Sequence, residues 1–210
     1  MLSEKGVSCK GEVHIGKVAK ESVVIASHFS QPLAVLIRKA LKDTDNLTAN
    51  CFFKKLGQLR EGAPGTWQNG SKALRRFLEE RVLLDIDRVV VLDGSGESRY
   101  NLISPHHIVQ CLRWISTQFA IGPEFLSALP LSGCDGTLGK RLKNPETCKK
   151  IRAKTGAMTG STSLSGFAES RDGEQFIFSI IINGFTKPAR EVRYTIEDSI
   201  CETLVKFSWH

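Results

Sequence analysis

The stretch IRAKTGAMTGSTSLSGFAESRDGEQFIFSIIING, residues 151–184, decides the fold class. It holds three segments typical of strands, rich in β-branched and small residues, at 151–157, 161–170 and 174–184. The pair Asp172-Gly173 between the last two favours a hairpin turn, because both residues tolerate positive φ. Three consecutive strands without intervening helices predict an antiparallel sheet rather than a doubly wound parallel one.

The residues around this stretch predict helices before and after the sheet. Apolar spacing predicts two helices within residues 32–59, joined by a polar elbow at 43–46. Ser71 and Ser104 are the expected N-caps of two further helices. A last helix is expected from about residue 189 to residue 208. The expected class is therefore α+β.

Shorter strands and loops are expected in the first half of the chain. β-Branched residues predict strands at VHIGKV (13–18) and SVVIASH (22–28), and RVVVLD (88–93) is expected as a short buried strand. The turn-rich residues 60–70 and the basic residues 130–150 are expected as loops.

Composition and charge exclude several classes of protein. The chain has 210 residues with 41% hydrophobic content, enough for one core, and its longest apolar runs, such as FIFSIII (176–182), are too short to cross a bilayer, which takes about 18 residues. The net charge of +7 admits an anionic partner without requiring one. The six cysteines lack zinc-ligand spacing, and Cys111 is expected as a buried free thiol. No metal and no cofactor are therefore expected.

Positive charge concentrates in residues 140–154. Seven cations lie there against one acid, Glu146: Lys140, Arg141, Lys143, Lys149, Lys150, Arg152 and Lys154. This window can be a solvated loop or a basic wall beside a site for a carboxylate-bearing ligand. No aromatic side chains are interleaved for base stacking, so no nucleic acid partner is expected.

The triplet Lys154-Thr155-Gly156 is the most informative candidate site. The glycine lets a substrate backbone approach, the threonine can donate a hydroxyl to a carboxylate, and the lysine supplies positive potential. A second element is Ser98 with Asn101, where a hydroxyl could relay a proton to a leaving amine and an amide could hold a peptide carbonyl. The alternative for this second element is a polar turn.

Two other motifs give weaker evidence of a functional site. The DGSG turn at 93–96 is not a dinucleotide-binding loop, because Arg99 occupies the place of the third glycine. His106 and His107 lie in the first turn of a predicted helix and have no evident ligand partners, so a solvated helix face is expected.

Five blocks of sequence together resemble a known family, the low-molecular-mass class C penicillin-binding proteins, which are serine D-Ala-D-Ala carboxypeptidases and endopeptidases. The blocks are SQPLAVLIRKALKDTDNLTAN, PGTWQNGSKAL, VVVLDGSGESRYNLISP, LPLSGCDGTLGKRL and AKTGAMTGSTSLSGF. The resemblance implies a β-lactamase/transpeptidase-like domain, with a five-stranded antiparallel sheet flanked by helices.

The resemblance also implies roles for residues. Lys154, Thr155 and Gly156 would line the substrate cleft, and the backbone N–H of Ala157 would be an oxyanion donor. Ser98 and Asn101 would be the family's second motif. That motif usually has one residue between its serine and asparagine, so Ser95 remains an alternative serine. Asp45-Asn46 resembles the S-D-N motif of β-lactamases, with Thr44 where serine is usual, and is interpreted as structural.

One departure from the family concerns the nucleophile. Members acylate a serine in S-x-x-K, and no lysine of this sequence has serine three positions before it. We therefore expect residues 30–210 to be the C-terminal part of a transpeptidase-like domain that is N-terminally incomplete, and residues 1–29 the remainder of an upstream or inserted region. The isolated chain is expected to be inactive.

The expected partners follow from the resemblance. They are a peptidoglycan peptide ending in D-Ala-D-Ala, and β-lactams only if a nucleophile is supplied. The nucleophile could come from a separate N-terminal polypeptide, or be lost through a misplaced or interrupted gene start. The family implies the periplasm, whereas the chain as written has no signal peptide and would stay cytoplasmic. The alternative function is a non-catalytic remnant or a cell-wall-peptide binding module.

Overall fold

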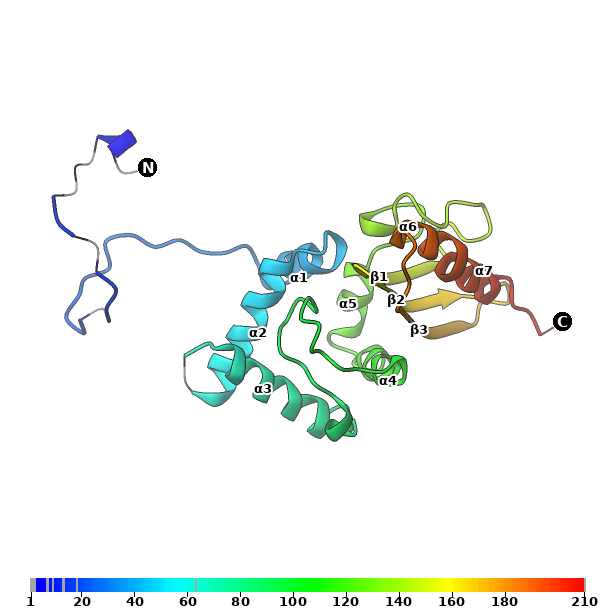
Figure 1. Cartoon of the computed structure of the whole chain (residues 1–210), viewed down its shortest axis with the longest axis horizontal. Coiled ribbons are helices and arrows are strands. Elements are labelled where there is room, and N and C mark those ends of the chain that lie inside the picture. Colours follow the sequence, from blue (N-terminus) through cyan, green and yellow to red (C-terminus); the bar gives the residue numbers. More distant parts are fainter. Residues whose placement is uncertain are drawn as a thin grey trace. The chain divides into compact units, whose positions relative to one another are not determined.

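A computed structural model describes residues 3–6, 8, 10–12, 14–17, 19–62 and 64–209. The chain divides into two compact units, Met1–Gln31 and Pro32–His210. Its elements are η1 (Ser3–Lys5), α1 (Leu33–Lys42), α2 (Asn46–Glu61), α3 (Trp67–Glu80), η2 (Ile86–Arg88), α4 (Pro105–Ser116), α5 (Gly122–Ala128), η3 (Gly136–Leu138), β1 (Ile151–Met158), β2 (Ser161–Glu169), β3 (Gln175–Asn183), α6 (Ala189–Val192), η4 (Arg193–Glu197) and α7 (Asp198–Lys206), as Figure 1 shows.

The first unit contains no strand among its described residues. Residues 22–28 are exposed and unpaired, so the strand predicted there is wrong. Of the other predicted strand, residues 14–17 are also unpaired, and Val13 and Val18 lie outside the described residues. β-Branched residues favour an extended chain, but a strand also needs a neighbouring strand to accept its backbone hydrogen bonds.

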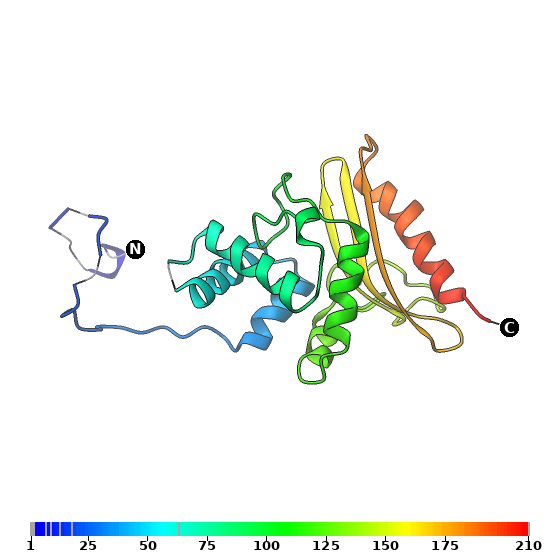
Figure 2. The same cartoon turned by 90° about the horizontal axis from the view of Figure 1, so that it is seen from below.

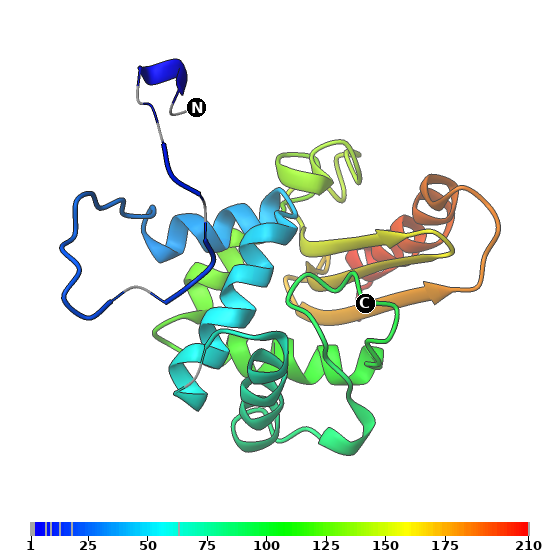
Figure 3. The same ribbon diagram turned by 60° about the vertical axis from the view of Figure 1, so that its left-hand side comes forward.

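The sheet of the second unit confirms the antiparallel prediction. Its order is β1-β2-β3, and both pairings are antiparallel (Figure 3). In the turn between β2 and β3, Gly173 takes a φ of 82°, whereas Asp172 has no positive φ. The resemblance implied five strands; the described residues form a sheet of three, with β1 and β3 at its edges.

Helices cover both faces of the sheet, which confirms the α+β class. Figure 2 shows α4 against one face and the C-terminal helices against the other. Alternate residues of β2 are buried, as expected for a strand with an inward face. The core of this region comprises Leu138, Leu142, Ile151, Ala153, Leu164, Ala168, Phe178, Cys201 and Val205. No helix among the described residues is long and apolar enough to span a membrane.

The helices before the sheet follow the prediction in part. The elbow between α1 and α2 is confirmed. The predicted cap Ser71 is wrong: α3 begins at Trp67 and is capped by Thr66, while the Ser71 hydroxyl donates to the Val91 carbonyl at 2.5 Å. A mid-helix serine can bond outward in this way when its side chain faces a neighbouring loop.

Two further expectations need correction. Residues 88–93 form no strand, because only one isolated bridge, between Val90 and Leu102, is made there. Ser104 caps α4 as predicted, but His107 is 7% exposed and completes a capping box with Ser104, so it does not lie on a solvated face.

The cysteines of the described residues are free thiols. Burial raises the pKa of Cys111 to about 11, although its side chain is only half-buried. Burial likewise raises the pKa of the buried Cys201 to about 12. Cys9 lies outside the described residues. The thiols of Cys111 and Cys201 are therefore poor nucleophiles near neutral pH.

Candidate active site

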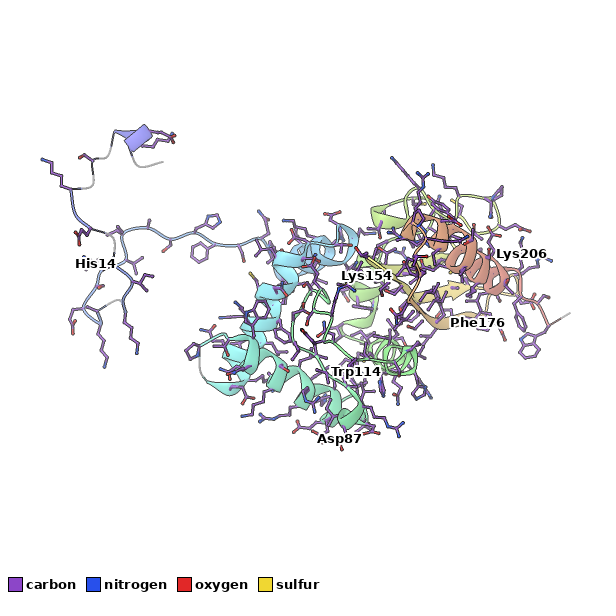
Figure 4. The ribbon with its side chains drawn as sticks, viewed as in Figure 1. His14, Asp87, Trp114, Lys154, Phe176 and Lys206 are labelled. Carbon is purple, nitrogen blue, oxygen red and sulfur yellow. The ribbon has the colours of Figure 1, made fainter. Side chains whose placement is uncertain are left out.

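The K-T-G triplet lies on β1, an edge strand of the sheet. The Lys154 ammonium donates to Thr44 Oγ1 at 2.7 Å and to the Thr155 carbonyl at 2.8 Å. Figure 4 shows Lys154 where the end of α1 meets the sheet. Burial lowers the pKa of Lys154 to about 8, because removal from water disfavours the charged ammonium. Lys154 can thus exchange a proton close to neutral pH.

Thr44 lies in the elbow between α1 and α2, in a strained backbone conformation. Its φ is 57°, in the left-handed region that β-branched residues rarely adopt. The next residue, Asp45, caps α2 by accepting from Thr48 N at 2.8 Å, and it pairs with Lys39 Nζ at 2.6 Å. These bonds lower the pKa of Asp45 to about 2, and the bond to Lys39 has the largest effect. The capped elbow therefore holds the Thr44 hydroxyl against Lys154.

A cavity of about 800 Å³ opens beside Lys154. Segments far apart in the sequence supply its polar lining, which includes Thr44, Asn46, Ser95, Ser98, Asn101, Lys154 and Ser163. Apolar side chains form other parts of its wall, among them Leu74, Leu78, Val91 and Ile181. The cavity can therefore accept an apolar segment and a polar reacting group together.

Thr44 and Asn46 are the site residues that sequence reasoning missed. From the sequence alone this elbow is interpreted as structural, because threonine stands where serine is usual. A signal was nevertheless present, since Thr44 and Asn46 have one residue between them, which is the spacing expected of the second motif.

The DGSG loop uses most of its polar groups to hold its own shape. The Asp93 carboxylate accepts four hydrogen bonds, from Ser95 Oγ at 3.3 Å, Gly96 N at 2.9 Å, Ser98 N at 2.8 Å and Asn101 Nδ2 at 2.8 Å. Burial tends to raise the pKa of Asp93, but these bonds outweigh it and lower the pKa. The loop is thereby fixed around one carboxylate.

Ser98 and Asn101, which the sequence predicts as the second motif, both make hydrogen bonds within this loop. Ser98 Oγ accepts from Tyr100 N at 3.3 Å, and Asn101 Oδ1 accepts from Leu92 N at 2.8 Å. Among the described residues, the side-chain hydroxyl bonded to Lys154 is that of Thr44. Ser98, Asn101 and the alternative serine Ser95 all border the cavity, and all three also make hydrogen bonds within the loop.

Thr155 faces a second hydroxyl rather than the large cavity. Its Oγ1 lies 2.9 Å from Oγ1 of Thr137, an exposed residue of η3. The loop carrying Thr137 is tied to α1, because Asp135 pairs with Lys42 Nζ at 2.5 Å. Two adjacent hydroxyls on one edge can both donate to a single carboxylate.

Gly156 and Ala157 complete the triplet strand. A Cβ added at Gly156 would collide with Ser163 Oγ on β2, so a side chain there would require the Ser163 hydroxyl to rotate away. Ala157 is exposed. The backbone N–H groups of Ile151 and Ala153 donate away from β2, to Ser132 Oγ and the Pro130 carbonyl. Because strands have a two-residue period, the N–H of Ala157 faces the same open edge.

The basic window does not form a single wall. Arg141 is 4% exposed and binds Glu197 and Asp198 inside the domain, while Lys150 pairs with Glu169. Neither alternative for this window, a solvated loop or a basic wall, describes all of its cations, because the partners of Arg141 and Lys150 come from β2 and the C-terminal helices, far along the sequence. Lys154 alone of these cations borders the large cavity.

Comparison with known proteins agrees with this geometry. Residues 1–205 match the family model described as the D-Ala-D-Ala carboxypeptidase 3 (S13) family. The chain belongs to the S13 family. A D-alanyl-D-alanine carboxypeptidase of Actinomadura sp. is 32% identical over 218 residues, covering all of this chain and 39% of that protein. The D-alanyl-D-alanine carboxypeptidase DacB of Haemophilus influenzae is 29% identical over 187 residues, 88% of this chain and 39% of that protein.

Solved structures give the same picture. Penicillin-binding protein 4 of Haemophilus influenzae, complexed with a β-lactam, superposes with a TM-score of 0.86 at 28% identity, over 98% of this chain and 49% of that chain. The TLA-1 S70G β-lactamase superposes with a TM-score of 0.63 at 17% identity, which shows the fold only. This S13 chain thus spans about two fifths of the curated relatives it matches.

Proposed function

We propose that this chain is the K-T-G-bearing part of a serine D-Ala-D-Ala carboxypeptidase or endopeptidase that acts on peptidoglycan stem peptides in the periplasm. The observation that carries the proposal is the hydrogen bond between Lys154 and Thr44, which joins the triplet strand to the T-D-N elbow across the cavity. In this assignment Thr44, rather than Ser98, is the hydroxyl that relays a proton to the leaving amine.

The remaining residues take roles around the substrate. Asn46 offers an amide to the substrate's peptide carbonyl, and Thr155 with Thr137 offers two hydroxyls to its terminal carboxylate. The N–H of Ala157 is the oxyanion donor on the strand edge. Lys154 supplies positive potential and, with its lowered pKa, a proton that Thr44 can pass on.

The acylated serine must come from residues other than these 210. No S-x-x-K occurs in the sequence, so the chain has no nucleophile paired with a lysine base. The cavity beside Lys154 supports this assignment, because its apolar walls would suit a packed helix, while Thr44 and Lys154 would face a serine on that helix. Without that segment, we expect no covalent catalysis.

A second candidate function is a non-catalytic module that binds cell-wall peptides. The missing S-x-x-K favours it, as do the paired hydroxyls of Thr137 and Thr155, which can bind a carboxylate without any nucleophile. The two functions differ in one observable: only the first requires that a serine-bearing segment restore acylation.

Labelling with a fluorescent penicillin tests the proposal. The isolated chain should remain unlabelled. The DNA upstream of the Met1 codon should encode an S-x-x-K segment, and the protein that includes this segment, hereafter the reconstituted protein, should label. Absence of such a segment in every upstream frame, or no labelling of the reconstituted protein, would overturn the enzymatic assignment in favour of the binding module.

A matched pair of variants sharpens this test. In the reconstituted protein, Thr44→Val should slow labelling much more than Ser98→Ala, because only the first removes the hydroxyl bonded to Lys154. Equal effects of the two changes would contradict the assignment of Thr44.

A further inference from the structure

A buried charged cluster lies between the C-terminal helices and the sheet. Arg141 Nη2 donates to Glu197 Oε2 at 2.9 Å and to Asp198 Oδ1 at 2.6 Å. The three side chains are at most 8% exposed. Burial tends to lower the pKa of Arg141, but its bonds to Asp198 and Glu197 outweigh this and raise the pKa. The guanidinium therefore stays charged and holds both carboxylates.

One carboxylate of this cluster reaches the sheet. Glu197 is the last residue of η4, a π-helical segment that widens the helix between α6 and α7. Its Oε1 accepts from Thr162 Oγ1 on β2 at 2.9 Å. Thr162 is 1% exposed, so no water competes for this bond. The carboxylate thus fixes the rotamer of the Thr162 side chain.

Thr162 connects the cluster to the K-T-G strand. Its Oγ1 also lies 3.1 Å from the Gly156 carbonyl oxygen, and the single hydroxyl proton is shared between this oxygen and Glu197. A continuous hydrogen-bonded path therefore runs from Arg141 through Glu197 and Thr162 to Gly156. This path reaches the candidate active site at the triplet strand.

The Gly156 carbonyl belongs to the same peptide unit as the Ala157 N–H. A trans peptide is planar, with its C=O and N–H pointing in opposite directions. The ladder pairing of Gly156 with Ser163 already turns this carbonyl toward β2, and the Thr162 hydroxyl adds a side-chain hydrogen bond that holds it there. This added bond therefore tightens the direction of the N–H at the open edge. It also polarises the peptide unit, which strengthens the N–H as a donor.

We propose that Thr162, held by Glu197 and Arg141, is a positioning residue that aims the Ala157 N–H as oxyanion donor. This inference rests on the proposed function, because it assigns a purpose to the Ala157 N–H. Thr162, Glu197 and Arg141 would then support the active site without touching substrate or nucleophile. This role would also explain why a charged cluster, which is costly to bury, lies beside this sheet.

The experiment uses three variants. Thr162→Val removes the hydroxyl and keeps the shape, and Thr162→Ser restores a hydroxyl. Ser132→Ala is the matched control for lost stability, because it removes another fully buried hydroxyl, which bonds to the Thr147 carbonyl and to the N–H of Ile151 at the far end of β1. Each variant is compared with the wild type by two measurements.

The first measurement is the amide resonance of Ala157 in the isolated chain, labelled with ¹⁵N-alanine. We expect Thr162→Val to shift this resonance and to speed its hydrogen exchange relative to Ala153. Thr162→Ser and Ser132→Ala should leave it near its wild-type position. An unmoved Ala157 resonance in Thr162→Val overturns the inference, whether or not the proposed function holds.

The second measurement is the acylation rate of the reconstituted protein by a penicillin. Loss of a whole oxyanion donor costs about 10²–10³ in rate, so a misdirected donor in Thr162→Val should cost about tenfold. Thr162→Ser should recover the rate, and Ser132→Ala should keep it. A shifted Ala157 resonance with an unchanged rate overturns the inference. Failure of the wild-type reconstituted protein to acylate contradicts the proposed function instead, and the amide measurement still decides whether Thr162 orients Ala157.

Discussion

Two regions beside the cavity, the T-D-N elbow and the DGSG loop, present similar residues with opposite uses. Each has a hydroxyl residue, an aspartate and an asparagine. In the DGSG loop, the Asp93 carboxylate accepts hydrogen bonds from neighbouring donors, and both the oxygen and the nitrogen of the Asn101 amide are hydrogen-bonded. In the elbow, Asp45 instead caps α2, which leaves Thr44 to bond with Lys154. A polar residue is available for chemistry when the local turn does not need it.

Backbone conformation separates the two regions in the same way. Thr44 has a φ of 57°, which is unfavourable for a β-branched residue, whereas in the DGSG loop the one positive φ is that of Gly96, which tolerates it. The elbow thus holds strain at a residue that contacts the site lysine, and the loop does not. The predictions below test this difference, from the largest expected effect to the smallest.

Removing the centre of the DGSG loop should have the largest effect. Asp93→Ala deletes an acceptor of four hydrogen bonds and should lower the free energy of unfolding by about 3 kcal/mol, measured by urea denaturation. Asp87→Ala, at an exposed residue of η2, is the control and should be nearly neutral. A nearly neutral Asp93→Ala would show that the loop does not depend on this carboxylate.

The pH dependence of stability should reveal the burial of Lys154. Its folded pKa, about 8, lies below the unfolded value of 10.5, so the unfolded state binds more protons between these values. Wild-type stability should therefore gain a contribution from this residue as the pH rises from 8 to 10.5, and Lys154→Met should lose that contribution. Urea denaturation at pH 8 and at pH 10.5 measures this contribution. An equal change in unfolding free energy between the two pH values in both proteins would contradict a buried lysine.

Relieving the strain at Thr44 should stabilise the fold. Asparagine tolerates the left-handed region and can still accept a hydrogen bond, so Thr44→Asn should raise the free energy of unfolding by about 1 kcal/mol. A thermal melt alongside the wild type measures the change. A loss of stability would show that the elbow is not strained. Such a gain at a working residue is common where sites trade stability for function.

The smallest effect is expected at Ser98. Ser98→Ala removes an acceptor for the N–H of Tyr100, which is exposed and can bind water instead. The loss should be about 0.5 kcal/mol, within the lower range for one hydrogen bond. A loss as large as that of Asp93→Ala would mean that Ser98 has a further buried partner.

The parts of the fold that sequence could predict are those with local signals. The strands from 151 to 184 follow from their composition and from the Asp172-Gly173 turn, and α4 follows from its Ser104 cap. Residues 22–28 have strand-like composition but no partner strand, and a composition signal cannot supply one. Val90 likewise pairs only at one point.

The site was harder to predict because its contacts are distant in sequence. Lys154 could be identified from its triplet, but Thr44 lies 110 positions away, and only the fold brings them together. Arg141 falls within a basic window of the sequence, and its acidic partners lie 56 and 57 residues further on. Local charge patterns predict neither burial nor pairing at such separations.

The most direct test of the account is an NMR titration of the Lys154 side chain in the isolated chain and two variants. The wild type should titrate near pH 8. In Thr44→Val the pKa should fall further, because the ammonium loses a hydrogen-bond acceptor that favours its charged form. In Ser98→Ala it should not change. A pKa that shifts in Ser98→Ala and stays fixed in Thr44→Val would contradict the assignment of Thr44 as the partner of Lys154.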